Sequence, residues 1–193
     1  MRRIVSLAVK YTKTSLPGVL IIEPVVFKDD RGFFLETHHQ RKYVEGGIDT
    51  SFVQDNRSHS KKGVLRGLHY QLRYPQGKLV YVITGEIFDV AVDIRRGSPT
   101  FGKWEGIYLS SDNNRQVFVP EGFAHGFCVV SETADVLYKC TDFYKPDDEF
   151  GILWSDPTMS IEWPVASPVL SSKDSQYPQL TEIADDFLPR AAV

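Results

Sequence analysis

Short apolar runs separated by turn residues follow one another along the middle of the chain. Residues 78–93 read KLVYVITGEIFDVAVD, in which two such runs lie on either side of Thr84-Gly85-Glu86. This pattern predicts two strands joined by a hairpin-type connection. Further strands are expected over residues 104–109, 116–120, 124–130 and 135–141, with a turn at residues 97–100. Short strands at this spacing are typical of a β-sandwich or barrel.

Residues 88–93 show a clear alternation along one of these strands, FDVAVD. Successive side chains of a strand point to opposite faces of its sheet. One face of this strand is therefore predicted to be buried, while the other meets solvent or a pocket.

Helical pattern is scarce. Residues 37–45 fit one short helix, which Gly46-Gly47 would end. From about residue 147 the chain is rich in Asp, Pro and Ser, and we expect this C-terminal segment to wrap around the strands. Its composition does not shift enough to mark a second domain, so residues 1–193 are predicted to form a single domain.

Composition narrows the classes of function. Of the 193 residues, 42% are hydrophobic and 24% are charged, which suits one globular core. The net charge of −3 gives no general attraction to phosphate polymers, so the basic cluster at residues 57–66 is a weak sign of nucleic-acid binding. An anionic ligand would have to be held by a few well-placed arginines and lysines.

The two cysteines and the N-terminus indicate a compartment. Cys128 and Cys140 lie in apolar strand-like runs and are interpreted as buried free thiols, with a cross-strand disulfide as the alternative. The first apolar run ends at Lys10, too short for a signal peptide, and no later run reaches membrane-spanning length. The sequence therefore predicts a soluble, cytoplasmic protein.

Residues 63–71, GVLRGLHYQ, carry the most informative chemistry. A metal-binding jelly roll places two histidines one residue apart, so that both face the lumen, but here the second position is Gln71, an amide that binds transition metals poorly. Residues 120–125, PEGFAH, supply the later half of such a motif, whereas residues 72–78 contain no carboxylate. The two half-motifs suit a jelly roll built from two Greek keys. Losing half the ligand set favours acid–base chemistry over metal chemistry.

His69 is the candidate base, because a lumen histidine held by a carboxylate accepts protons well near neutral pH. A satisfied core histidine is the alternative, and the neighbouring polar residues Arg66, Gln71 and Lys78 count against it. Tyr138 is able to transfer a proton, and Lys78 to stabilise an enolate oxygen. Taken alone, Tyr138 is better interpreted as a core aromatic residue and Lys78 as a surface lysine.

Residues 30–36, DRGFFLE, combine a turn with basic, aromatic and acidic groups. Arg31 suits a phosphate oxygen and an aromatic ring there suits stacking on a base. Residues 54–56, QDN, add donors and acceptors for sugar hydroxyls and base edges. A polar hairpin rim explains the same composition equally well. No Walker loop or Gly-x-Gly-x-x-Gly fingerprint is present, which argues against the common ATP and NAD folds.

Across residues 16–174 the sequence resembles the dTDP-4-dehydrorhamnose 3,5-epimerase family. The matching stretches are residues 29–32 (DDRG), 54–56, 63–71, 76–80 (QGKLV), 88–93, 120–127 (PEGFAHGF), 154–157 (WSDP) and 172–174 (SKD). The resemblance implies an all-β, cupin-type double-stranded β-helix, or jelly-roll barrel, with a few short helices. It also implies a protein that needs neither cofactor nor metal and forms a homodimer, with an N-terminal strand contributed across the interface.

The resemblance further implies an isomerase that converts dTDP-4-dehydro-6-deoxy-D-glucose into dTDP-4-dehydro-L-rhamnose for dTDP-rhamnose biosynthesis. By this likeness His69 is the base, oriented by Asp174, and Tyr138 is the acid on the opposite face of the sugar. Lys78 holds the C4 keto oxygen as enolate charge develops. The positions implied to contact the nucleotide sugar are Arg31, Glu36, Gln54, Asn56, Arg66, His125, Glu149 and Lys173, with Arg31 and Glu36 reaching the partner's site.

The chain departs from the family pattern at His38 and His39 and at the pair Ser171-Ser172, none of which belongs to the implied catalytic set. Three alternatives remain open. One is an epimerase that acts at C3 or C5 alone in another deoxysugar pathway. The others are a metal-dependent cupin oxygenase using His69 and His125, and a non-catalytic jelly roll that binds a nucleotide sugar.

Overall fold

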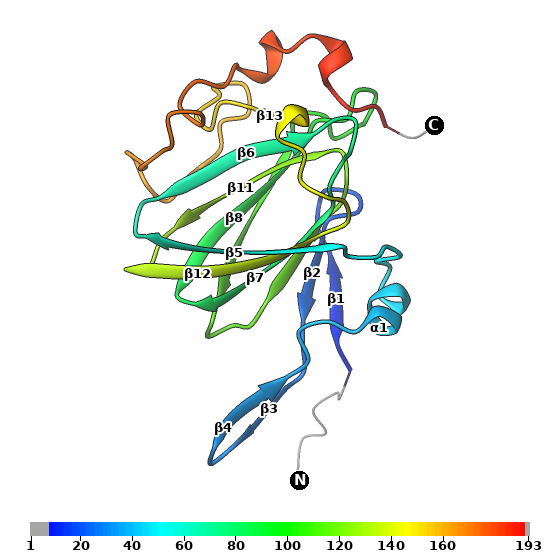
Figure 1. Cartoon of the computed structure of the whole chain (residues 1–193), viewed down its shortest axis with the longest axis vertical. Helices are drawn as coiled ribbons and strands as arrows, with labels where there is room; N and C mark the ends of the chain where they lie inside the picture. The colour runs from blue at the N-terminus through cyan, green and yellow to red at the C-terminus, as the bar shows by residue number, and fades with distance from the viewer. Residues whose placement is uncertain (1–7, 192–193) are drawn as a thin grey trace.

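The computed structural model of the chain describes residues 8–191, and its core consists of two antiparallel sheets that face each other (Figure 1). The six-stranded sheet has the order β1–β2–β10–β7–β12–β5, formed by β1 (Lys10–Lys13), β2 (Leu20–Glu23), β5 (Gln54–Lys61), β7 (Lys78–Thr84), β10 (Gln116–Val119) and β12 (Thr133–Cys140). The five-stranded sheet has the order β13–β6–β11–β8–β9, formed by β6 (Leu65–Gln71), β8 (Glu86–Asp93), β9 (Trp104–Ser110), β11 (Phe123–Val129) and β13 (Glu149–Gly151). The strands predicted from the apolar runs are confirmed.

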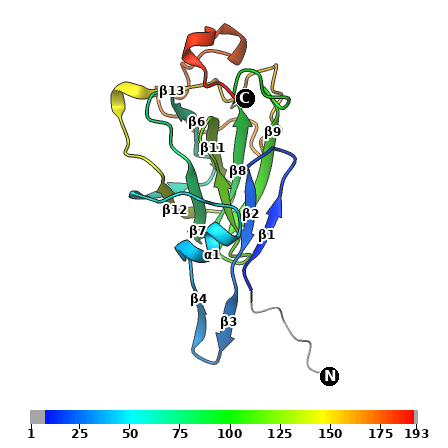
Figure 2. The same ribbon diagram turned by 90° about the vertical axis from the view of Figure 1, so that its right-hand side faces the viewer.

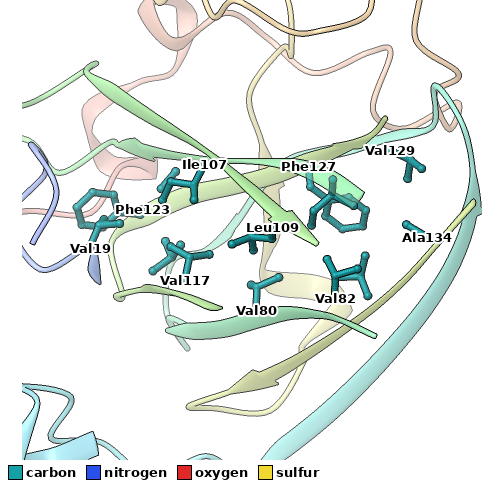
Figure 3. Close-up of a cluster of buried hydrophobic side chains, with 14 of the residues drawn as sticks. Val19, Val80, Val82, Ile107, Leu109, Val117, Phe123, Phe127, Val129 and Ala134 are labelled. Atoms are coloured by element: carbon teal, nitrogen blue, oxygen red, sulfur yellow. The ribbon is translucent and has the colours of Figure 1, made fainter. Parts of the chain in front are cut away.

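Apolar side chains from both sheets meet between them. Val80 and Val82 of β7, Ile107 and Leu109 of β9 and Phe127 of β11 belong to this core, and Figure 3 shows them pointing toward one another. Their burial supplies the main driving force that holds the two sheets together.

The hairpin predicted at Thr84-Gly85-Glu86 is wrong, because β7 and β8 lie in different sheets. β7 pairs with β10 and β12, whereas β8 pairs with β9 and β11. Gly85 has a φ of +81°, and a Cβ at this position would collide with the carbonyl oxygen of Thr133. A tight turn reverses the chain in either arrangement, so the turn signal alone could not identify the strand's partner.

The alternation in β8 agrees with its position in the sheet. Val90 and Val92 pack under the C-terminal segment, against Ile152 and Met159. Asp89, on the opposite face, points into the space between the sheets, where it contacts His125. Figure 1 shows the C-terminal segment running across the outer side of the five-stranded sheet. It includes the short 3₁₀ helices η2 (Leu180–Glu182) and η3 (Asp185–Phe187), and η1 (Pro146–Asp148) precedes β13.

The predicted short helix is α1 (Gln40–Glu45), which begins three residues later than expected and ends at Gly46. Its Tyr43 packs with Leu20, Ile22 and Phe118 on the outer face of the six-stranded sheet. Before α1, β3 (Val26–Asp29) and β4 (Gly32–Leu35) form a hairpin that projects away from both sheets (Figures 1 and 2).

Two further predictions concern the cysteines and membrane segments. Cys128 and Cys140 are both free and buried, as expected. Burial raises the pKa of the Cys128 thiol to about 11. Within residues 8–191, no helix has the length and apolar character needed to cross a membrane.

Candidate active site

A cavity of about 730 Å³ lies between the two sheets, within the size range of small-molecule sites. Strands of both sheets line it, and the turn at residues 171–174 closes one side. The predicted site residues that line this cavity are Gln54, Asn56, Arg66, His69, Lys78, His125, Tyr138, Glu149, Lys173 and Asp174. Ten of the twelve predicted positions are therefore brought together from segments far apart in the sequence.

A bulge in β6 places Arg66 and His69 on the same side of the sheet. His69 is paired with His125 on β11, while Arg66 is paired with Phe127, so three steps on β6 match two on its neighbour. The extra residue restores the alternation, so that both side chains face the cavity. At the bulge, β6 and β11 approach each other closely at Gly67. A Cβ at this position would lie 2.5 Å from the Cα of Gly126, so a glycine is needed there.

His69 is held by a buried carboxylate. Its Nε2 lies 2.6 Å from Oδ1 of Asp174, which is 3% exposed. Burial alone would raise the pKa of Asp174, but the hydrogen bond and charge of His69, with help from Ser171, lower it below its ordinary value. An ionised Asp174 accepts a hydrogen bond from Nε2–H, and Nδ1 is then the nitrogen that keeps its lone pair.

His125 forms a second imidazole–carboxylate pair. Its Nε2 lies 2.9 and 3.0 Å from the two carboxylate oxygens of Asp89, and both residues are buried. Because His125 is the cross-strand neighbour of His69, two imidazoles lie side by side in the cavity wall, each held by its own carboxylate.

Lys78 projects into the cavity from the six-stranded sheet. Burial lowers the pKa of its ammonium group, and the nearby Cys140, Glu149 and Asp89 only partly oppose that effect. Within residues 8–191, no carboxylate oxygen lies within 4.0 Å of its Nζ. An ammonium group without an ion-pair partner is available to stabilise negative charge on a ligand.

Tyr138 lines the same cavity as His69, from the opposite sheet. It lies on β12, whose neighbours are β5 and β7, while His69 lies on β6. Burial raises the pKa of Tyr138, and Cys140 and Glu149 add to this effect while Arg66 opposes it. The phenol therefore stays protonated until a strong proton acceptor forms beside it.

Glu149 and Lys173 form an ion pair at the cavity wall. Oε2 of Glu149 accepts hydrogen bonds from Nζ of Lys173 at 2.5 Å and from the Tyr144 hydroxyl at 2.9 Å. Burial alone would raise the pKa of Glu149, yet these bonds hold it below its ordinary value. Oε1 lies 4.0 Å from Nδ1 of His69, too far for a hydrogen bond.

Hydrogen bonds to neighbouring residues hold three of the predicted polar side chains, two on β5 and one on β6. Gln54 donates to Oδ1 of Asn56 at 3.1 Å, and Asn56 donates to Sγ of Cys140 at 3.5 Å. Arg66 donates to Oγ of Ser60 at 3.1 and 3.2 Å, leaving part of its guanidinium group free at the exposed rim. These groups, from both sheets, supply the cavity with donors suited to phosphate and sugar oxygens.

Arg31 and Glu36 do not line the cavity of their own chain. Arg31 lies at the tip of the β3–β4 hairpin, 90% exposed, where it pairs with Asp29. Glu36 follows the hairpin and pairs with Lys42 at 2.8 Å. The expectation that both residues reach a partner's site concerns a second chain and stays a prediction.

The residues that would form a cupin metal site are engaged elsewhere. The Gln71 amide donates to the carbonyl oxygens of Tyr74 and Phe143 and accepts a hydrogen bond from the backbone N–H of Lys145. In the described part of the chain, no three His, Cys, Asp or Glu side chains are grouped so as to hold a metal ion.

Several cavity residues were missed by the sequence reasoning. Ser58, Gln76 and Tyr144 line the cavity, and Tyr177 packs against His69 just outside it. Ser58 follows Gln54 and Asn56 at period two on β5, so the alternation of that strand could have identified it. Nothing in the local sequence distinguishes Tyr144 or Tyr177 from the other seven tyrosines of the chain.

Comparison with known proteins gives a consistent picture. A family model described as dTDP-4-dehydrorhamnose 3,5-epimerase matches residues 13–182. A dTDP-4-dehydrorhamnose 3,5-epimerase of Shigella flexneri is 60% identical over 164 residues, covering 84% of this chain and 91% of the relative. A second, from Pseudomonas aeruginosa, is 57% identical, with 86% and 93% covered.

Solved structures agree. The epimerase of Legionella pneumophila, in complex with dTDP-4-keto-L-rhamnose, is 51% identical, with a TM-score of 0.93 and coverage of 96% of this chain and 100% of that one. A 3'-monoepimerase from Streptomyces bikiniensis, in complex with dTDP-quinovose, is 32% identical, with a TM-score of 0.86 and coverage of 92% and 91%. The predicted cupin-type jelly roll is confirmed by this likeness.

Proposed function

The chain belongs to the dTDP-4-dehydrorhamnose 3,5-epimerase family, and we propose that it epimerises dTDP-4-dehydro-6-deoxy-D-glucose at C3 and C5 through His69, Tyr138 and Lys78. It is an isomerase, and its product is dTDP-4-dehydro-L-rhamnose. The observation that carries the residue assignment is the cavity itself. An imidazole–carboxylate pair and a phenol lie on opposite sheets, with an ammonium group in the same space.

The substrate's own chemistry requires these three groups. The protons at C3 and C5 are both α to the C4 carbonyl, so removing either one leaves an enolate. Inversion then needs a proton delivered to the opposite face of the same carbon. A base on one side, an acid on the other and a cation at the oxygen complete the reaction without any change in oxidation state.

His69 takes the proton. Because Asp174 holds Nε2–H, the lone pair of Nδ1 faces the substrate carbon, and the ionised carboxylate stabilises the imidazolium that forms. Asp174 does not itself need to accept the proton. It orients the ring and supplies the opposite charge.

Lys78 and Tyr138 complete the cycle. The electron pair of the broken C–H bond moves to the C4 oxygen, where the ammonium group of Lys78 stabilises the charge. Tyr138 gives its proton to the enolate carbon from the other face. The resulting phenolate is reprotonated from solvent while His69 releases its proton.

Nucleotide-sugar binding is assigned to the remaining polar groups of the cavity. Arg66 and Lys173 supply positive charge for the diphosphate, and the amides of Gln54 and Asn56 supply donors for sugar and base oxygens. His125, whose Nε2–H is held by Asp89, offers Nδ1 as an acceptor for a sugar hydroxyl. Glu149 anchors Lys173 and so sets the position of that charge.

We also propose a homodimer in which N-terminal strands are contributed across the interface. On the β3–β4 hairpin, Phe27, Phe33 and Phe34 are 51%, 62% and 69% exposed. Isolated two-stranded hairpins are marginally stable in water, and exposed aromatic clusters favour a protein partner. Packing this hairpin on a second chain would bury the rings and carry Arg31 and Glu36 toward that chain's cavity.

Proton exchange in D2O tests the reaction directly. The purified protein, incubated with the substrate and a chelator, is expected to introduce deuterium at both C3 and C5, detected by NMR. Exchange at one carbon alone would identify a single-position epimerase, the activity that its 3'-monoepimerase relative is named for. Binding of the nucleotide sugar without exchange at either carbon would overturn the proposal, and loss of exchange on chelation would indicate metal chemistry.

A further inference from the structure

Tyr177 packs against the proposed base without lining the active-site cavity. Its ring centroid lies 5.8 Å from that of His69, with the two planes at 72°, an edge-to-face contact. Tyr177 lines a neighbouring cavity of about 390 Å³ instead, together with Phe150 and Phe187. Its hydroxyl oxygen is buried and has no hydrogen-bond partner within residues 8–191. The ring, rather than the hydroxyl, therefore makes the contact that matters.

A glycine provides the space for this ring. Gly151 on β13 is the cross-strand neighbour of His69 on β6, and a Cβ at Gly151 would collide with the ring of Tyr177. Gly151 has ordinary strand backbone, and its φ is not positive. A side chain is therefore excluded at position 151 by the tyrosine and not by the backbone conformation.

One short segment brings both neighbours to the imidazole. Asp174 and Tyr177 are three residues apart, in a turn in which the N–H of Ser175 donates to the carbonyl of Ser171. The segment is fixed just beyond Tyr177, because the N–H of Leu153 donates to the carbonyl of Pro178 at 2.8 Å. The carboxylate fixes Nε2, but a single hydrogen bond leaves the ring free to tilt about it. An aromatic edge against the ring restricts that tilt.

We infer that Tyr177, seated on Gly151, is a positioning residue that fixes the plane of the His69 imidazole for proton abstraction. This inference rests on the proposed function and adds to it a residue outside the cavity. Misplacing a reacting group by about 1 Å can cost about 100-fold in rate. Because Tyr177 does not line the cavity, its loss should lower kcat and leave KM nearly unchanged.

The test compares kcat and KM of the wild type with Y177F, Y177A, G151A and the double variant Y177A/G151A. Y177F keeps the ring and should retain kcat within about twofold, whereas Y177A should lose about 10- to 100-fold. G151A should displace the ring and cause a similar loss. Since both changes act through the same contact, the double variant should be no slower than Y177A. M159A controls for lost stability, because it truncates a buried residue of the same C-terminal segment away from His69. When assayed at temperatures below its melting temperature, M159A should have the kcat of the wild type.

A measurement independent of turnover separates this inference from the proposed function. The short Nε2–H bond to Asp174 should give a downfield proton NMR signal that is absent in H69N. The signal should persist in Y177F and broaden or vanish in Y177A. An unchanged signal in Y177A, kcat within threefold of wild type, or losses that multiply in the double variant would each overturn the role of Tyr177. Absence of exchange by the wild type would instead reject the proposed function, and the NMR signal would still decide the role of Tyr177.

Discussion

The charge on Asp174 decides which nitrogen of His69 can accept a proton. The carboxylate lies 2.6 Å from Nε2 and is almost fully buried, so water does not compete for this bond. The remaining nitrogen faces a cavity whose opposite wall carries Tyr138. His69 and Tyr138 thus line one cavity from opposite sheets, which is the arrangement that inversion by a base and an acid requires.

Substituting His69 and substituting Tyr138 should change proton exchange and inversion of the sugar in different ways. H69N should abolish deuterium uptake at C3 and C5, because no group remains to remove either proton. Y138F should still take up deuterium but return it to the face from which the proton left, so the substrate keeps its configuration. Proton NMR of the sugar in D2O separates exchange from inversion. Full inversion by Y138F would show that another group supplies the second proton.

Lys78 should contribute mainly to the transition state, where negative charge develops at the C4 oxygen. K78M is expected to lower kcat by about 100- to 1,000-fold, the range for removing one oxyanion-stabilising group. Lys139 offers a matched control, since it lies on β12 next to Tyr138 but pairs with Asp55 at 2.9 Å. K139M should keep kcat close to wild type in steady-state assays. Equal losses in both variants would contradict a specific role for Lys78.

The turn after β8 is stabilised by a buried carboxylate. Oxygens of Asp93 accept hydrogen bonds from Arg95, Ser98 and Thr100 at 2.6–3.0 Å. Burial alone would raise the pKa of Asp93, but these bonds lower it to about 2. Since the folded pKa lies below the ordinary value of about 3.9, Asp93 stabilises the fold at neutral pH.

This stabilisation should disappear in acid. The lowering of the Asp93 pKa to about 2 corresponds to about 2 kcal/mol of stability, present above pH 4 and lost as the pH falls toward 2. D93N should therefore unfold about 2 kcal/mol more easily than wild type at pH 7, and the two should converge near pH 2 in urea titrations. D112N, at an exposed turn, should match wild type throughout. A D93N deficit that does not shrink in acid would contradict the assignment.

Sequence patterns identified the strands more reliably than their partners. The apolar runs of β7 and β8 were evident, but their assignment to separate sheets depends on contacts with β10, β11 and β12 that no local pattern records. The bulge in β6 is another example. Period two would place Arg66 on the face opposite His69, and only the two-to-three pairing with β11 corrects this.

At the scale of the whole molecule, the site joins residues more than 100 positions apart. His69 and Asp174 are separated by 105 residues, and nothing in composition or periodicity links them. The resemblance to a family supplied that pairing, whereas local chemistry alone pointed to His69, Arg66 and Lys78. Neither source pointed to Tyr177, because its contact with His69 depends on the space that Gly151 leaves for its ring.

The projecting hairpin is the part of the fold that a single chain does not explain. The rings of Phe27 and Phe34 pack together with their centroids 6.5 Å apart, yet both side chains remain about half exposed or more. A groove at the base of the hairpin, lined by Val9, Tyr11 and Val25, is also open. Two apolar surfaces on one arm favour pairing with a second copy in a closed, two-fold arrangement.

If Arg31 acts in the partner's site, an inactive variant and a variant with weakened binding should restore activity when combined. R31A should raise KM about 10-fold or more by removing a charged phosphate contact, and H69N should lack the base. In a mixed dimer, the R31A chain provides His69 and the H69N chain provides Arg31, so one site is intact. Random reassociation makes about half of all dimers mixed, which restores about a quarter of wild-type sites. Activity of co-refolded R31A and H69N, measured at substrate concentrations well below the KM of R31A, checks this. R31A mixed with the double variant R31A/H69N is the control and should show no recovery, since no chain then carries Arg31. Failure of the first mixture to exceed this control would place Arg31 in its own chain's site or in none.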